Sequence, residues 1–194
     1  PEILSLSLFM FVTSFSPGPN NIVASHSGFN HGMKKTIPLM LGVIFGFTTM
    51  ITIVNFGLIN IFKLYPIIQK TLIFTGTIFL IYLAYKISFS KTNTQEKKLN
   101  AVTFTETFMY QFLNPKGVIV AIISVSTYVE AGNNFLNYSL WVIGVAFVFA
   151  IISIIFWVLI GKFMSKFATN DKFIKLFNYA MSLLLLSCIT TFYL

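Results

Sequence analysis

The chain has 194 residues, of which 56% are hydrophobic and only 9% charged, and its formal net charge of +8 comes entirely from lysine. Typical soluble domains are about 25% charged, so this composition excludes an ordinary soluble fold. The lysines lie between apolar runs rather than in basic patches on a polar surface, which argues against a nucleic-acid partner. The single Cys188 excludes an intramolecular disulfide and a dithiol redox pair. We therefore expect an integral membrane protein.

Six apolar runs follow one another along the chain, each longer than the roughly 20 residues that cross about 30 Å of hydrocarbon. The chain begins without a basic segment, so its first run does not resemble a cleavable signal peptide. The expected fold is all-α and polytopic, with a single transmembrane domain over residues 1–194. Its six helices are expected at residues 3–29, 36–62, 65–87, 102–129, 135–160 and 173–194.

The first run is interrupted at residues 16–21, where the sequence reads SPGPNN. Proline has no N–H and clashes with the carbonyl four residues back, so Pro17 and Pro19 should release the carbonyls of Thr13 and Phe15. In a membrane, released backbone groups are tolerated only where they are buried in protein or line a watery cavity. We expect a broken helix here.

The fourth run carries a second interruption at residues 114–117, NPKG. Asn114 followed by Pro115 is typical of a helix N-cap with proline at the first helical position. Breaks in the first and fourth of six spans suggest two inverted repeats of three helices, at about residues 1–88 and 101–194. Secondary transporters use this design and bind substrate near the midplane, where the breaks meet.

The lysines predict the orientation. The loops after the first, third and fifth runs are rich in lysine, whereas the other side carries only Lys63 and Lys70. The positive-inside rule places the lysine-rich side in the cytoplasm. We therefore expect a multi-pass protein of the bacterial inner membrane with both termini outward.

The two breaks predict a binding site. Each opens a half-helix whose free N–H groups and partial positive charge attract a carboxylate, and amide side chains nearby can both donate and accept hydrogen bonds. Such a site suits a small zwitterion. No metal-ligand spacing is present, and no cofactor or catalytic residue is expected. The predicted substrate-binding residues are Pro17, Gly18, Pro19, Asn20, Asn21, Gln111, Asn114, Pro115 and Lys116.

Two charged residues of the fourth run are candidates for proton coupling. Lys116 lies about ten residues inside the run, roughly 15 Å deep, where a charge costs about 2.5 to 3.5 kcal/mol. It either pairs with a carboxylate or changes charge during transport, or it simply pairs with backbone carbonyls; we favour a functional role. Glu106 is either a coupling acid or a solvated carboxylate at the interface, and the second interpretation is narrowly favoured. His26 and His31 are expected to be polar interfacial residues.

Gly42 and Gly46 form a G-x-x-x-G pair in the second run. Small residues at this spacing let two helix backbones approach closely. We expect the pair to pack inside the bundle, against the broken first span. The alternative is the interface of a homodimer.

Taken together, residues 16–21, the following Gly28, Gly32, Gly42 and Gly46, and the run 110–116 (YQFLNPK) resemble the LysE/RhtB family of amino-acid exporters. The double asparagine, the turn at residues 28–32 and the context of Gln111 are similar to its cysteine and O-acetylserine exporter subgroup. The resemblance implies proton-driven export, by antiport, of a small neutral amino acid or derivative of the cysteine, O-acetylserine or threonine/homoserine class. Phe47 stands where many members have an acidic residue, which weakens the case for a cationic substrate.

Other classes stay open on sequence alone. A channel or a lipid-translocating protein could use the same broken helices. A membrane enzyme is less favoured because no nucleophile, base and metal pattern falls within the spans. ATP hydrolysis is not expected, because the G-x-x-x-x-G-K-[ST] loop is absent from the sequence.

Overall fold

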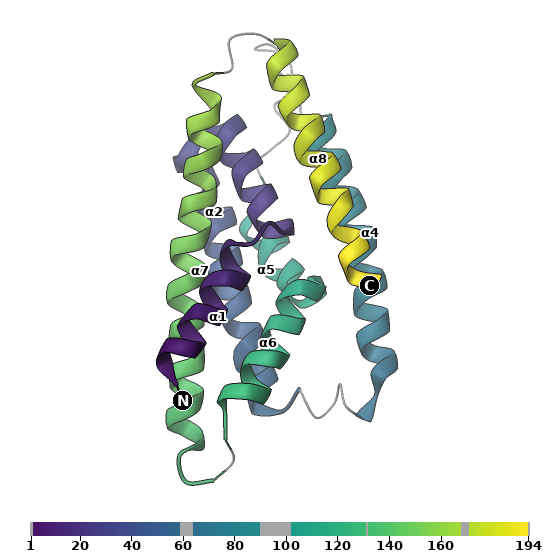
Figure 1. Cartoon of the computed structure of the whole chain (residues 1–194). Helices are drawn as coiled ribbons and strands as arrows, with labels where there is room; N and C mark the ends of the chain where they lie inside the picture. The colour runs from purple at the N-terminus through teal and green to yellow at the C-terminus, as the bar shows by residue number, and fades with distance from the viewer. Residues whose placement is uncertain (1, 59–63, 90–101, 131, 168–170, 194) are drawn as a thin grey trace.

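The computed structural model describes residues 2–58, 64–89, 102–130, 132–167 and 171–193. Within these ranges all regular secondary structure is helical, which confirms the all-α expectation. Figure 1 shows an elongated bundle in which α2 and α7 form one side, α4 and α8 the other, and α1, α5 and α6 lie between the two ends. The most extensive contacts join α2 to α7, α2 to α5 and α4 to α8.

The first apolar run is broken where its prolines predict. Helix α1 (Ile3–Phe15) ends just before the break, residues 16–18 are not helical, and α2 (Pro19–Ile53) begins at the second proline. A second bend inside α2 lies at Gly32, whose φ of 73° and ψ of 174° are not helical. Glycine tolerates this positive φ because it has no Cβ. The bend divides α2 into two helical segments, residues 19–31 and 33–53.

The remaining elements follow the expected runs closely. After α2 come a π-helical turn, η1 (Val54–Leu58), and α4 (Pro66–Ser88). The second broken run consists of α5 (Phe104–Leu113) and α6 (Pro115–Tyr128), which meet at an angle of 61°. The last two helices are α7 (Phe135–Ser165) and α8 (Asp171–Tyr193). The interruption at Asn114 is thus present, with Pro115 at the first helical position.

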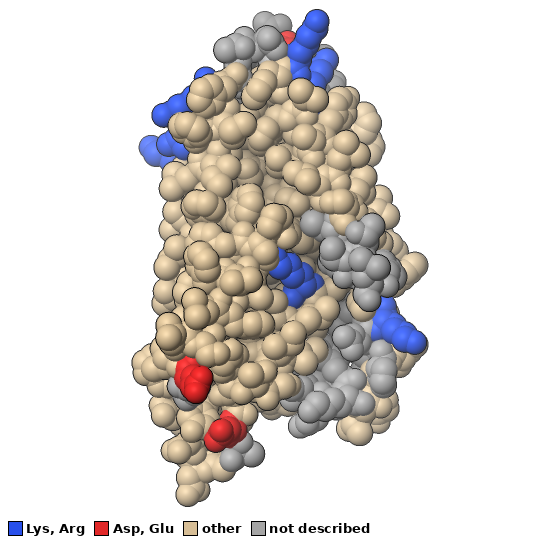
Figure 2. All heavy atoms as spheres, in the orientation of Figure 1, with Lys and Arg blue, Asp and Glu red and all other residues tan. Residues whose placement is uncertain are grey.

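Two helical stretches are long and apolar enough to cross a membrane, namely Pro19–Gly57 and Phe135–Ser165. The bent pair α5 and α6 supplies a third crossing if it is counted as one span. By length and hydropathy the described helices therefore account for two or three crossings. Most of the face in Figure 2 is uncharged, with the majority of charged side chains gathered toward the two ends of the bundle.

Glycines bring the long helices close together. A Cβ at Gly42 would collide with the Thr107 hydroxyl and the Phe104 carbonyl, and one at Gly46 would come within 2.7 Å of Gln111 Cγ. The pair therefore packs inside the bundle against α5, the first half of the second broken run, rather than against the first. Gly161 of α7 approaches the Ser25 carbonyl of α2 in the same way.

Candidate functional site

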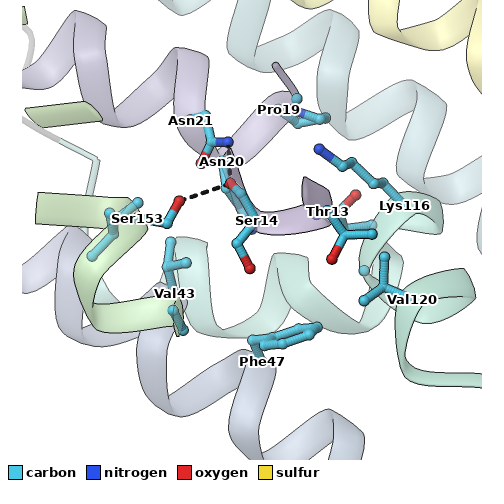
Figure 3. A pocket seen from close by; sticks show the side chains of 15 residues that line it. Thr13, Ser14, Pro19, Asn20, Asn21, Val43, Phe47, Lys116, Val120 and Ser153 are labelled. Carbon is cyan, nitrogen blue, oxygen red and sulfur yellow. Dashed lines mark hydrogen bonds between the residues drawn. The ribbon is translucent and has the colours of Figure 1, made fainter. Parts of the chain in front are cut away.

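The two breaks lie side by side and enclose a pocket. The cavity has a volume of about 70 Å³. Since one water needs roughly 10–15 Å³, it has room for several waters. Side chains from four helices and both breaks point into it (Figure 3). The residues that line it are Thr13, Ser14, Gly18, Pro19, Asn20, Asn21, Val43, Phe47, Asn114, Lys116, Gly117, Val120, Ala150, Ser153 and Ile154.

The sequence-predicted residues divide into two groups. Gly18, Pro19, Asn20, Asn21, Asn114 and Lys116 line the pocket, whereas Pro17, Gln111 and Pro115 are in contact with those residues or adjacent to them without lining it. Sequence reasoning missed the hydroxyls of Thr13, Ser14 and Ser153. An isolated serine inside an apolar run was the available signal, but several other serines share it.

Lys116 joins the two breaks. Its Nζ donates to the Ser16 carbonyl at 2.9 Å and the Ser16 hydroxyl at 2.8 Å, and it lies 3.3 Å from the Pro17 carbonyl. These oxygens are at the carboxyl end of α1, where the helix dipole favours a cation. In this conformation the ammonium group of the second break is therefore held by backbone carbonyls of the first, as in the simpler of the two interpretations made from the sequence.

The carbonyls at the end of α1 receive further donors. Asn21 Nδ2 donates to the carbonyls of Ser14 at 2.8 Å and Ser16 at 2.9 Å, and Ser153 Oγ of α7 donates to Ser14 at 2.7 Å (Figure 3). The Thr13 carbonyl, which Pro17 cannot bond, accepts the Ser16 hydroxyl at 3.0 Å. Side chains thus replace the lost helical hydrogen bonds and hold the break open.

Asn20 and Gln111 form a second link between the breaks. Asn20 Nδ2 donates to Gln111 Oε1 at 2.8 Å, and Gln111 Nε2 donates back to Asn20 Oδ1 at 3.0 Å. Gln111 is fully buried and also donates to the Thr107 carbonyl. Because all four polar atoms of the two side-chain amides are engaged in this pair, the contact fixes the wall of the pocket beside Asn20.

Asn114 differs from the other amides. It occupies the N-cap position of α6, but its side chain makes no capping hydrogen bond. The residue is 2% exposed, lines the pocket, and its Oδ1 has no hydrogen-bond partner among the described residues. A buried acceptor without a donor costs free energy, so this oxygen is available to a donor that enters the pocket.

The starts of α2 and α6 provide the complementary groups. Pro19 and Pro115 each occupy the first turn of a helix that begins beside the pocket. The first N–H groups of a helix have no intrahelical partner and carry a partial positive charge. The pocket therefore combines N–H donors that suit an anionic group with an acceptor that suits a cationic group. A zwitterion carries both kinds of group. None of its lining residues is acidic.

Glu106 lies outside the pocket, in the first turn of α5. It forms an ion pair with Lys86 at 3.0 Å and completes a capping box with Thr103. Both side chains of the ion pair are partly exposed. These contacts are those of a carboxylate that stabilises a helix start, and a role for Glu106 in proton coupling stays a prediction.

His26 is buried, with 5% exposure, rather than interfacial. It lies in the segment 19–31 of α2, where the neighbouring Asn30 donates to Asn178 of α8 at 3.0 Å. Phe29 stacks on Phe177 in the same contact, with ring centroids 3.8 Å apart. This end of the segment is therefore a packing contact with α8, away from the pocket.

A helical bundle with an apolar surface, two broken helices and a pocket lined partly by polar groups of both breaks is the architecture expected of a membrane protein that transports a small solute. Comparisons with known proteins agree. The family model described as "LysE type translocator" matches residues 11–190. The chain therefore belongs to the LysE family, whose members are transporters and not enzymes.

Relatives with assigned names cover nearly the whole chain. A cysteine/O-acetylserine efflux protein of Salmonella typhimurium is 28% identical over 183 residues, covering 93% of this chain and 91% of its own length. The cysteine/O-acetylserine efflux protein of Escherichia coli (strain K12) is 26% identical over 192 residues, covering 97% and 96%. No solved structure matches the chain.

Proposed function

We propose that this protein is a secondary transporter that exports small neutral amino acids or their derivatives, of the cysteine, O-acetylserine or threonine/homoserine class. Family membership and the names of its relatives support amino-acid export. The observation that carries the proposal is the pocket between the breaks, which is lined by Asn114, whose Oδ1 has no partner among the described residues, and by residues at the starts of α2 and α6.

The substrate would bind with its charges divided between these groups. Its carboxylate approaches the N–H groups at the starts of α2 and α6, and its ammonium group donates to Asn114 Oδ1. Its side chain then points toward Val43, Phe47 and Ile154, the apolar part of the lining. A cationic side chain would find no acidic partner there, so small uncharged side chains are favoured.

We further propose that α1 with residues 19–31 forms the first of six crossings and α5 with α6 the fourth, in two inverted repeats. The α1 break and the α5–α6 break meet through Lys116 and Asn20, as expected of matching positions in the two halves. The lysine-rich end of α7 and the lysine-rich start of α8 would then face the cytoplasm. Both chain termini would face outward.

Uphill export needs an energy source, and we propose the proton gradient. Of the two charged residues considered, Lys116 is the better candidate for the coupling group, because it lines the pocket and its contacts join the two breaks. Glu106 instead forms an ion pair with Lys86 and a capping box with Thr103.

Reconstitution into liposomes tests the proposal. Asn114→Ala should lower O-acetylserine or cysteine transport at least about tenfold, the effect of losing roughly 1.4 kcal/mol of binding. Asn20→Ala should also lower transport, because it removes the contact with Gln111 that fixes the wall of the pocket. Asn137→Ala, at an exposed position of α7, is the matched control and should transport normally. A substrate gradient should also drive proton flux.

Two results would contradict the proposal. Normal transport by both pocket variants would show that the substrate binds elsewhere. Substrate flux that never runs uphill in a proton gradient would instead identify a channel.

A further inference from the structure

We propose that the oxygen atoms at the end of α1 form a binding site for a small monovalent cation, and that the Lys116 ammonium group fills this site from within the chain. The inference concerns the pocket of the proposed function and deepens it. Its central observation is that three oxygens, from Ser16 and Pro17, lie within 3.3 Å of Lys116 Nζ.

The ligands are of the type that binds free cations. Two of the three are backbone carbonyls at the carboxyl end of a half-helix, and the third is a hydroxyl. Carbonyls and helix ends of this kind hold sodium ions or protons in transporters with broken helices. None of the residues that line the pocket is acidic, and the dipole of α1 favours a cation beside these neutral oxygens.

The residues around Lys116 leave room for its side chain. Gly18 lies against its aliphatic chain, and a Cβ there would come within 2.9 Å of Nζ and 3.0 Å of Cδ. The lysine itself is the second residue of α6, so the filled site ties the end of α1 to the start of α6. Since Lys116 also lines the pocket, removing its side chain would open the oxygens to water and to ions.

The intact protein and its Lys116 variants should differ in their need for a free cation. The intact protein needs no sodium ion at this position, because its own ammonium group is already bound there. A variant with a short side chain should acquire a requirement for a free cation. A variant with an apolar chain of similar length should not, because the hydrocarbon fills the space and excludes the ion.

Thermal unfolding of the purified full-length protein tests this without any substrate. Sodium chloride or methylammonium chloride should stabilise Lys116→Ala relative to choline chloride at equal ionic strength. The melting temperature should rise with cation concentration to a plateau about 2–4 °C higher, the shift that about 1 kcal/mol produces in a chain of this size. The unmodified protein and Lys116→Met should melt at the same temperature in all three salts. A folded Lys116→Ala protein that shows no preference among the salts overturns the inference.

Two further measurements keep the inference falsifiable. If Lys116→Ala does not fold in choline but is recovered in sodium, the site is supported; if it folds in neither, Lys116→Ser takes its place, and the absence of a cation effect there overturns the inference. In liposomes, sodium should raise transport by Lys116→Ala several-fold and leave Lys116→Met unchanged. Because the unfolding assay contains no substrate, its result is independent of whether the protein exports amino acids.

Discussion

Asn20 and Gln111 exchange two hydrogen bonds, of 2.8 and 3.0 Å, across the junction of the two broken helices. They are 91 residues apart in the sequence and belong to different halves of the chain. Each side chain satisfies the other, so neither needs water or a ligand. The pair therefore makes the position of α5 depend on that of the segment 19–31 of α2.

A double-mutant cycle should reveal this dependence. Asn20→Ala and Gln111→Ala each leave a partly or fully buried amide without its partner, which costs about 1–3 kcal/mol. The double variant should lose less than the sum, with a coupling of about 0.5–3 kcal/mol. Melting temperatures in detergent measure the effect, and Asn137→Ala serves as the exposed control. Additive losses would show that the two amides do not support one another.

Much of this junction could be predicted from the sequence because proline acts locally. Pro17 and Pro19 determine where a helical hydrogen bond must be missing, and Pro115 does the same in the second half. The bend at Gly32 falls within the turn predicted at residues 28–32, between the first two apolar runs. The continuation of helix on both sides of it, without a loop, was not predicted.

Gly42 and Gly46 provide a second prediction. Gly42→Ala should lower the free energy of unfolding by about 1–3 kcal/mol, because the added methyl group collides with backbone and side-chain atoms of α5 that cannot easily move. Gly144→Ala in α7 is the matched control. A Cβ at Gly144 meets no atom within 4 Å, and alanine is favoured over glycine in a helix by roughly 0.5–1 kcal/mol.

The two glycine variants should therefore change the melting temperature in opposite directions. Equal stability of Gly42→Ala and Gly144→Ala would show that α2 and α5 are not in close contact. A loss of dimer without any loss of stability in Gly42→Ala would indicate instead that the glycines form an interface between two copies of the chain.

Glu106 provides a third prediction, which separates a structural carboxylate from a coupling acid. Glutamine can replace glutamate in a capping box, so Glu106→Gln should keep most of the helix start and lose only the ion pair with Lys86. We expect transport within about twofold of normal, since a partly exposed pair contributes about 0–1 kcal/mol. Glu106→Ala should in addition lose the reciprocal bond from the Thr103 N–H, at about 0.5–1.5 kcal/mol, while the Thr103 side chain still caps the helix.

Proton flux in liposomes is the decisive measurement for Glu106. If Glu106→Gln is folded and binds substrate but no longer couples transport to the proton gradient, then Glu106 is the coupling acid and the assignment to Lys116 is wrong. The Lys86→Met variant is a useful companion, because it removes the same ion pair and leaves the carboxylate in place.

The contacts of the charged and polar residues could not be predicted in the same way. The depth of Lys116 indicated that it needs a partner, but the partner lies 100 residues away at Ser16, and no local pattern relates the two. Ser153 contributes to the same cluster of carbonyls only because α7 passes beside the first break. These contacts depend on how whole helices pack, and helix packing leaves little trace in a single sequence.

Asn114 should show that stability and transport can be separated within one site. Its Oδ1 is buried without a partner among the described residues, and its side chain does not cap α6. Asn114→Ala therefore removes a buried acceptor whose burial is uncompensated, and its melting temperature should equal or exceed that of the unmodified protein. Transport should nevertheless fall, because a hydrogen bond to the substrate ammonium group is worth about 1.5–3 kcal/mol.

Gln111→Ala is the comparison variant for Asn114→Ala. It breaks the hydrogen-bonded contact with Asn20 next to the same pocket, so it should lower the melting temperature. Adding O-acetylserine should raise the melting temperature of the unmodified protein and of Gln111→Ala more than that of Asn114→Ala. If Asn114→Ala melted as early as Gln111→Ala and kept its response to the substrate, the side chain would be a structural part of the break. A stable protein that no longer responds places Asn114 in direct contact with the substrate, because a buried acceptor that the fold leaves unsatisfied can be removed at no cost to stability.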